Sequence, residues 1–193
     1  MMRDLDVRRA LRRNVEYRHA GETDIRFVEE LGICQGMARV DLAVVNGSVH
    51  GYEIKSERDT LTRLPSQALI YSQALEFVTI VAAHQHLVRI EEGELIPGWW
   101  GVWSATQDDG EVQLKTVREA QPNPSLAPSA LVQFLWRDEV LEILTEHNLA
   151  SGMAGKSRRD LWDRLAKSFT VDEIGHFVRD RLKQRYKGWL AVA

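Results

Sequence analysis

Cysteine is almost absent from this sequence, and long apolar stretches are absent altogether. Cys34 is the only cysteine among 193 residues, which excludes an internal disulfide and a zinc site built on paired cysteines. We therefore expect a reducing compartment and Cys34 as a small buried residue. No stretch approaches the ~20 apolar residues of a membrane span, and residues 1–13 interleave arginines with acids, unlike a signal peptide. We expect a cytoplasmic protein with no membrane partner.

A strong excess of charge of either sign is also lacking, since the formal net charge is -3 at pH 7. The charge is nevertheless uneven, with basic residues near both ends and acids in the middle. The basic residues are Arg3, Arg8, Arg9, Arg12, Arg13 and Arg18, and then Lys156, Arg158, Arg159, Arg164, Lys167, Arg179, Arg181, Lys183, Arg185 and Lys187. Two interpretations stay open. Either the flanks contact nucleic-acid phosphates while central carboxylates hold a metal, or these charges cover solvated helix faces.

The composition, 44% hydrophobic and 27% charged, is typical of a soluble globular protein. Apolar periodicity predicts two helices and five strands before residue 120, with Asn46-Gly47 as a hairpin turn. The helices cover residues 3–15 and 63–77, and the strands cover 38–45, 48–55, 78–83, 99–106 and 111–117.

The last third of the chain has a different pattern. Three prolines between residues 121 and 128 indicate a linker, and three apolar stripes at helical spacing follow it. Ser157 with Asp160, and Thr170 with Glu173, fit the capping boxes of two of these helices. We therefore predict a core over residues 1–120, a proline-rich linker over 121–129 and a helical C-terminal extension over 130–193.

The hairpin carries the residues with the clearest chemistry. Asp41 lies in its first strand, and Glu53 and Lys55 lie in its second. Hard divalent cations such as magnesium prefer carboxylate oxygens, and a bound ion lowers the pKa of an attacking water. We expect Asp41 and Glu53 to hold such an ion together with the carbonyl of Ile54. Lys55 would position the water or stabilise charge that develops on a phosphate.

The register of the hairpin decides whether these side chains share a face. A two-residue loop at Asn46-Gly47 sets Asp41 opposite Tyr52 and separates it from Glu53. A three-residue loop that includes Ser48 sets Asp41 opposite Glu53. The reverse face then becomes nearly all apolar, with Val40, Leu42, Val44, Tyr52 and Ile54, and has His50 near the turn. Because burial favours an apolar face, we predict the three-residue loop, with a glycine in the left-handed conformation.

The helix that follows the hairpin carries Gln67 and Tyr71. Their spacing of four residues puts both side chains on one helical face, where an amide and a phenol reach a phosphate or a metal-bound water. We include both as catalytic residues with Asp41, Glu53 and Lys55. As an isolated pair they would be ordinary surface residues.

The order of these residues resembles the PD-(D/E)XK phosphodiesterase superfamily: Asp41 on one strand, Glu53-Ile-Lys55 on the next, and Gln67-x-x-x-Tyr71 on a helix. The stretch from Gly51 to Arg63 is also similar to a bacterial family of unassigned function within that superfamily. The resemblance implies a restriction-endonuclease-like α/β fold, with a central mixed sheet flanked by helices, over the predicted core. It also implies Mg²⁺ or Mn²⁺ as the cofactor.

Two departures from the superfamily pattern concern Val40 and the upstream acid. Val40 replaces the proline before Asp41, a variation that leaves metal ligation intact. The superfamily also contributes an acid upstream of the hairpin, for which Glu30 and Glu29 are both available. We prefer Glu30 as a further metal ligand, while a solvated structural role for either glutamate stays open.

These observations predict a metal-dependent nuclease, a hydrolase that cuts the phosphodiester bonds of DNA. The first alternative is an inactive module of the same fold that binds nucleic acid or a protein. The second is a structural or regulatory partner in a larger assembly. The basic C-terminal helices would bind DNA or form a lid, a homodimer interface or a docking surface for a protein. Three tryptophans, Trp99, Trp100 and Trp103, would either stack on nucleic-acid bases or pack in the core, and we favour the core.

Overall fold

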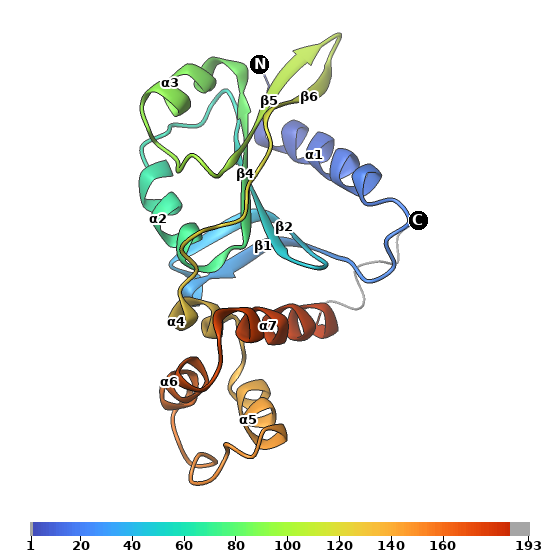
Figure 1. Cartoon of the computed structure of the whole chain (residues 1–193). Coiled ribbons are helices and arrows are strands. Elements are labelled where there is room, and N and C mark those ends of the chain that lie inside the picture. The colour runs from blue at the N-terminus through green and yellow to red at the C-terminus, as the bar shows by residue number, and fades with distance from the viewer. Residues whose placement is uncertain (1, 186–193) are drawn as a thin grey trace.

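A computed structural model of the chain describes residues 2–185, and Figure 1 shows one six-stranded mixed sheet at its centre. Neighbouring strands follow the order of the sequence. The pairs β3–β4 and β4–β5 are parallel, and the other three pairs are antiparallel. The strands are β1 (Arg26–Ile33), β2 (Ala38–Val45), β3 (Val49–Lys55), β4 (Phe77–Ala83), β5 (Gly101–Asp108) and β6 (Glu111–Arg118).

Seven α-helices accompany the sheet within the described residues, so the predicted α/β class with a mixed sheet is confirmed. They are α1 (Asp4–Arg18), α2 (Leu64–Ala74), α3 (Leu87–Glu92), α4 (Pro128–Leu131), α5 (Arg137–Glu146), α6 (Arg158–Ser168) and α7 (Val171–Arg185). The sequence did not predict α3. Between residues 2 and 185, no helix combines the length and the apolar character needed to cross a bilayer.

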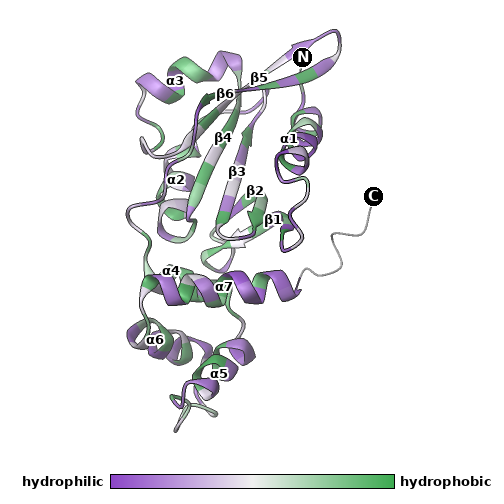
Figure 2. Cartoon of the chain, turned by 45° about the vertical axis from the view of Figure 1, so that its right-hand side comes forward, coloured by the Kyte–Doolittle hydropathy of each residue, from purple (hydrophilic) through white to green (hydrophobic). Residues whose placement is uncertain are grey.

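The sheet separates two hydrophobic cores. The smaller core lies between the sheet and α1, where Val7, Leu11 and Val15 pack against residues such as Leu42 and Ile54. The larger core covers the opposite face and includes residues of α2 and α3, and it continues into α4–α7 at one end of the sheet (Figures 1 and 2). Trp100 and Trp103 are 0% and 2% exposed, which confirms that they are core residues.

The C-terminal helices begin where the sequence predicts. Ser157 and Asp160 form a complete capping box at α6, and Thr170 exchanges hydrogen bonds with Glu173 at the start of α7. The proline-containing segment before α4 lies against the C-terminal end of α2, because the side-chain amide of Asn123 donates to the carbonyls of Ser72 and Leu75, both at 2.8 Å. The division at residues 120 and 130 stays a prediction.

The predicted register of the β2–β3 hairpin is confirmed. Val45 pairs with Val49 and Ala43 pairs with Gly51, so three residues form the loop, and the pairing ends at Leu42 and Tyr52, just before Asp41 and Glu53. The expected left-handed glycine is wrong, because Gly47 is not among the described residues that have a positive φ. Instead the side chain of Asn46 accepts a hydrogen bond from the amide of Ser48 at 3.2 Å, which closes the loop with ordinary backbone angles.

In the β1–β2 hairpin the side chains do not alternate strictly between the two faces of the sheet. This corrects the predicted position of Val40. Val40 belongs to the larger core together with Ala43 and Val45, whereas Leu42 and Val44 share one face as predicted, and that face packs against α1. On the facing strand, Glu30 has a φ of 55°. A left-handed residue in a strand turns the chain, so the side chains beyond it change faces. The ladder has no pair at Glu30 and Asp41, and both strands change faces there, since Val28 and Leu31 both lie in the larger core, as do Val40 and Ala43. We call the part of this hairpin beyond Glu30 and Asp41 its rotated end.

Candidate functional site

Asp41 lies where β2 and β3 separate. The last paired residues of these strands are Leu42 and Tyr52, and beyond them the backbone amide of Ile54 donates to Oδ2 of Asp41 at 2.7 Å. Oδ1 accepts from Nη2 of Arg8, also at 2.7 Å. Arg8 of α1 therefore contacts Asp41 of β2, and the Asp41 carboxylate, rather than a backbone carbonyl of β2, accepts the hydrogen bond from the Ile54 amide.

Glu53 and Lys55 project from β3 toward α2 and are almost fully buried, at 3% and 5% exposure. The Lys55 ammonium lies 2.5 Å from Oε1 of Glu53 and donates to the Gln67 side-chain oxygen at 3.0 Å. The Gln67 amide in turn donates to Oε1 of Glu53 at 2.7 Å. The hydroxyl of Tyr71 lies 2.7 Å from Oε2 of Glu53 and the same distance from the carbonyl of Arg39.

The structure thus brings the five predicted residues together, and the local reasons are those that the sequence suggested. Glu53 and Lys55 are two positions apart on one strand and share a face. Gln67 and Tyr71 are one helical turn apart on α2, which packs over that face. We name Asp41, Glu53, Lys55, Gln67 and Tyr71 the carboxylate cluster. Its assignment as the functional site stays a prediction.

The electrostatics of the cluster follow from burial. Burial, and next the charge of Glu53, raise the pKa of Asp41 from 3.8 to about 6, although the Ile54 amide and Arg8 oppose the shift. Burial and the neighbouring Glu53 also raise the pKa of Tyr71 above its ordinary value of 10. Tyr71 therefore stays neutral at physiological pH and acts as a hydrogen-bond donor to the buried carboxylate.

A cavity of about 460 Å³ opens beside the cluster. Asp41, Glu53, Lys55 and Gln67 line it, together with residues of the rotated β1–β2 hairpin end and of the segment before α2. Within that segment Asp59 accepts hydrogen bonds from the amide and the hydroxyl of Ser56, at 2.7 and 2.6 Å. Asp59, like Asp41 and Glu53, thus already has hydrogen-bond partners within the protein.

Arg8 is the member of this site that the sequence did not single out. Its guanidinium contacts Asp41 and also lies 3.1 Å from Oε1 of Glu30. Glu29 instead forms an ion pair with Arg12 at 3.2 Å, so Glu30 is the upstream glutamate that shares a partner with Asp41. Since Arg8 is one of six similar arginines near the N-terminus, only its position on the inward side of α1 distinguishes it.

The cluster does not fit the metal that the sequence led us to expect. Each side-chain oxygen of Asp41 and Glu53 lies within hydrogen-bond distance of a protein donor. Among residues 2–185, no group of three or more His, Cys, Asp or Glu side chains is arranged to hold a metal ion. When bound, a divalent ion supplies Lewis acidity. Here Arg8 and Lys55 would have to move before it could reach the carboxylates.

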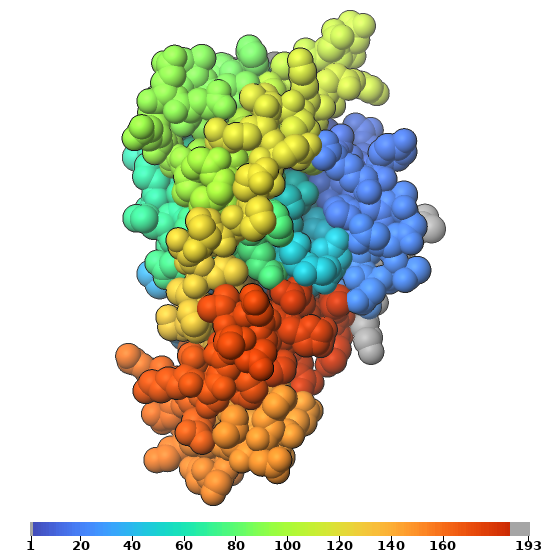
Figure 3. Space-filling view, viewed as in Figure 1, coloured from blue at the N-terminus to red at the C-terminus, as the bar shows by residue number. Residues whose placement is uncertain are grey.

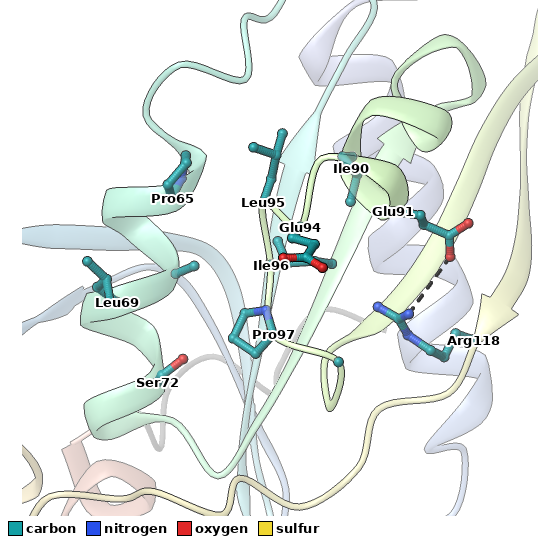
Figure 4. A pocket seen from close by; sticks show the side chains of 12 residues that line it. Pro65, Leu69, Ser72, Ile90, Glu91, Glu94, Leu95, Ile96, Pro97 and Arg118 are labelled. Atoms are coloured by element: carbon teal, nitrogen blue, oxygen red, sulfur yellow. Dashed lines mark ion pairs between the residues drawn. The ribbon is translucent and has the colours of Figure 1, made fainter.

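A second cavity, of about 660 Å³, lies beside α2 and shares no lining residue with the first. Figure 4 shows Pro65, Leu69 and Ser72 on α2 with Ile90 of α3 and Ile96 across the cavity. Glu91 and Arg118 form a long ion pair of 3.9 Å at its edge. Different positions along α2 thus line a polar cavity and a largely apolar one.

The fold and the cluster define an α/β protein with a buried, internally paired group of charges, and comparison with known proteins gives its family. The family described as Bacteriophage P4 protein cII matches residues 9–189. The chain is 27% identical to Protein cII of Enterobacteria phage P4 over 188 residues, which are 96% of this chain and 69% of that protein. No solved structure matches. The chain belongs to the bacteriophage P4 protein cII family.

This membership corrects the resemblance to the PD-(D/E)XK superfamily and the functions that followed from it. Neither match is to a nuclease, so the predicted metal-dependent hydrolase is wrong, as are the nuclease and metal-binding descriptions. The physical reason is that an acid, a turn and Glu-x-Lys form a short pattern, and the same pattern serves a paired structural cluster. The five residues do meet as expected, but their roles in hydrolysis are not retained.

Proposed function

We propose that this chain is a regulatory protein that binds double-stranded DNA through α6 and does not cut it. The family supports a role other than catalysis, since neither matching description names an enzyme. The observation that carries the proposal is that the basic side chains on and just before α6 are exposed and form no ion pairs among the described residues. The exposed cations in this segment are Lys156, Arg158, Arg159, Arg164 and Lys167, and within the described residues none has a carboxylate within 4 Å.

The other basic helices offer less free charge. On α7, for example, Arg179 is paired with Glu76 and Lys183 with Asp24. On α1, Arg8 and Arg12 are paired, while the exposed Arg9 and Arg13 share a groove with three acids, Asp6, Glu16 and Glu111. A phosphate backbone gains most from cations that need not give up a carboxylate first. This comparison favours α6 as the contact surface.

The position of α6 also suits a nucleic-acid partner. Leu161, Trp162 and Leu165 face the core, so the remaining sides of the helix are solvated. Figure 3 shows the C-terminal helices, in orange and red, at the lower end of the molecule. Asp160 is the acid nearest the start of the helix, and its carboxylate is engaged in the cap with Ser157. It therefore competes less with phosphate contacts.

Duplex DNA is favoured over a single strand because α6 offers no aromatic side chain for stacking. Its one aromatic residue, Trp162, is 6% exposed, and its indole donates to the carbonyl of Leu135 at 3.1 Å. Binding of single strands commonly uses exposed aromatic platforms. The restriction-endonuclease-like arrangement of the sheet, and a homodimer or protein partner through the C-terminal helices, stay predictions.

The test is fluorescence anisotropy with a labelled DNA duplex at several salt concentrations. We expect Arg159→Gln/Arg164→Gln to weaken binding about tenfold and to reduce the slope of log affinity against log salt by about 2. The matched variant Arg9→Gln/Arg13→Gln loses the same charge on α1 and should bind like the wild type. Single-stranded DNA and duplex RNA should bind more weakly than the DNA duplex.

Three results would reject the proposal. One is the absence of duplex binding at low salt. The second is an equal loss of affinity in both double variants, which would mean that net charge rather than α6 decides. The third is cleavage of plasmid DNA in the presence of magnesium that Asp41→Ala removes.

A further inference from the structure

The carboxylate cluster contains its own counter-cations. Nη2 of Arg8 lies 2.7 Å from Oδ1 of Asp41, and Nη1 donates to the backbone carbonyl of the same residue at 3.0 Å. Nη1 also lies 3.1 Å from the carboxylate of Glu30. One guanidinium thus collects two carboxylates and a carbonyl, which are the oxygen types that a hard divalent cation binds.

Lys55 has the equivalent position at Glu53. Its ammonium lies 2.5 Å from Oε1, inside a region that is almost closed to solvent. Gln67 and Tyr71 fix the orientation of the Glu53 carboxylate from α2. To bind Glu53, a metal would have to remove the charge partner of a buried lysine, and an unpaired buried ammonium is costly.

Contacts other than the ion pair with Asp41 also fix the position of Arg8. Its Nε donates to Asp4 one turn earlier on α1 at 3.4 Å, and the residues beside it, Val7 and Leu11, are fully buried in the smaller core. The guanidinium is therefore delivered to Asp41 by a helix that is packed on the sheet. Its place does not depend on a flexible loop.

We infer that Arg8 is the resident cation at Asp41, as Lys55 is at Glu53, so that the wild-type protein excludes divalent metals from both carboxylates. Asp41 would become available to a metal only when the charge of Arg8 is removed. Hydrated Mn²⁺ requires only one or two carboxylates, because water supplies its other ligands. The loss of a single arginine is therefore enough to expose a weak site.

The test is isothermal titration with Mn²⁺ at pH 8, where Asp41 is ionised, on the wild type and two arginine variants. Wild type and Arg9→Met, an exposed arginine on the same helix, should show no saturable binding below about 1 mM. Arg8→Met should show saturable binding of Mn²⁺, about tenfold tighter than the limit of about 1 mM expected for the other two proteins. Arg8→Met/Asp41→Asn should lose this gain, because the carboxylate that receives the ion is absent.

Two results would overturn the inference. Micromolar binding of Mn²⁺ to the wild type that Asp41→Asn removes would show that Arg8 does not keep the ion out. A folded Arg8→Met variant, checked by circular dichroism, with no gain in binding would show that Arg8 is not what excludes it. If Arg8→Met does not fold, Arg8→Gln replaces it with the same expectation, and the wild-type titration decides if neither folds.

Discussion

Arg8 of α1 and Asp41 of β2 form an ion pair of 2.7 Å across 33 residues of sequence. The pair is shielded on both sides, since the two side chains are 21% and 19% exposed. It joins α1 to the point where β2 leaves β3, next to the buried Glu53 and Lys55. The contact therefore links the first helix of the chain to the carboxylate cluster, and its loss should affect both.

Replacing Arg8 by Met should lower the free energy of unfolding by about 2 kcal/mol, because the half-buried Asp41 loses a charged hydrogen-bond donor. Methionine keeps most of the apolar length of the side chain, so the change isolates the guanidinium. Urea denaturation followed by circular dichroism gives the measurement. Arg9→Met, on the exposed side of α1, should change stability by no more than about 0.5 kcal/mol. Equal effects of the two substitutions would contradict the prediction.

Asp41 should give the protein a stability that falls as the pH rises. Its folded-state pKa of about 6 lies above the ordinary value of 3.8, so the native state binds this proton more tightly than the unfolded chain does. The contribution is complete below about pH 4 and is lost as the pH rises through about 6. Relative to Asp41→Asn, the wild type should therefore lose up to about 3 kcal/mol of unfolding free energy between about pH 4 and pH 7.

The pH dependence is measured by urea denaturation of both proteins at several pH values. In the Arg8→Met background the loss should move to higher pH, because Arg8 lowers the pKa of Asp41. A difference between wild type and Asp41→Asn that stays constant, or that grows with pH, would show that burial does not raise this pKa.

The sequence predicted the elements around the cluster well because their signals are local. The Asn46-Gly47 turn and the apolar positions of both strands specify one register, and that register occurs. The i, i+4 spacing likewise placed Gln67 and Tyr71 on one side of α2. Val40 was misplaced because strict alternation assumes regular strands, and the β1–β2 pairing is interrupted between Leu42 and Val40, where Glu30 of the neighbouring strand is left-handed. A glutamate at position 30 does not signal a left-handed conformation.

The chemistry of the cluster was less predictable than its geometry. Carboxylates that hold a metal and carboxylates that are paired with arginine look alike in a sequence. The difference here is Arg8, which reaches Asp41 only through the tertiary packing of α1. Among several arginines in the first eighteen residues, nothing local marks the one that points inward. Family membership, rather than the pattern itself, removed the nuclease interpretation.

Tyr71 should stabilise the fold mainly through its hydroxyl. The ring is fully buried, and the hydroxyl lies 2.7 Å from Oε2 of Glu53. Tyr71→Phe keeps the ring but removes a donor to a buried carboxylate, which should cost about 2 kcal/mol in urea denaturation. Tyr17→Phe is the matched control, because Tyr17 is 83% exposed and should be neutral. A neutral Tyr71→Phe would mean that Lys55 and Gln67 satisfy Glu53 without it.

Gly51 should be intolerant of even one added methyl group, because the rotated end of the β1–β2 hairpin packs over it. A Cβ at this position would lie 2.6 Å from Cδ1 of Leu75 and 3.1 Å from Cγ2 of Val40. Both neighbours are buried, so neither side chain can move away without disturbing the larger core. Gly51→Ala should therefore lower the free energy of unfolding by about 1 to 3 kcal/mol. Gly47→Ala should not, since nothing lies within 4 Å of its added Cβ.

A double variant tests the position of Val40. If Val40 faced α1, as strict alternation requires, a smaller residue at position 40 would leave the destabilisation by Gly51→Ala unchanged. Because Val40 contacts this position, Val40→Ala should relieve part of that destabilisation in the double variant, and urea denaturation of the four proteins in this cycle measures the coupling.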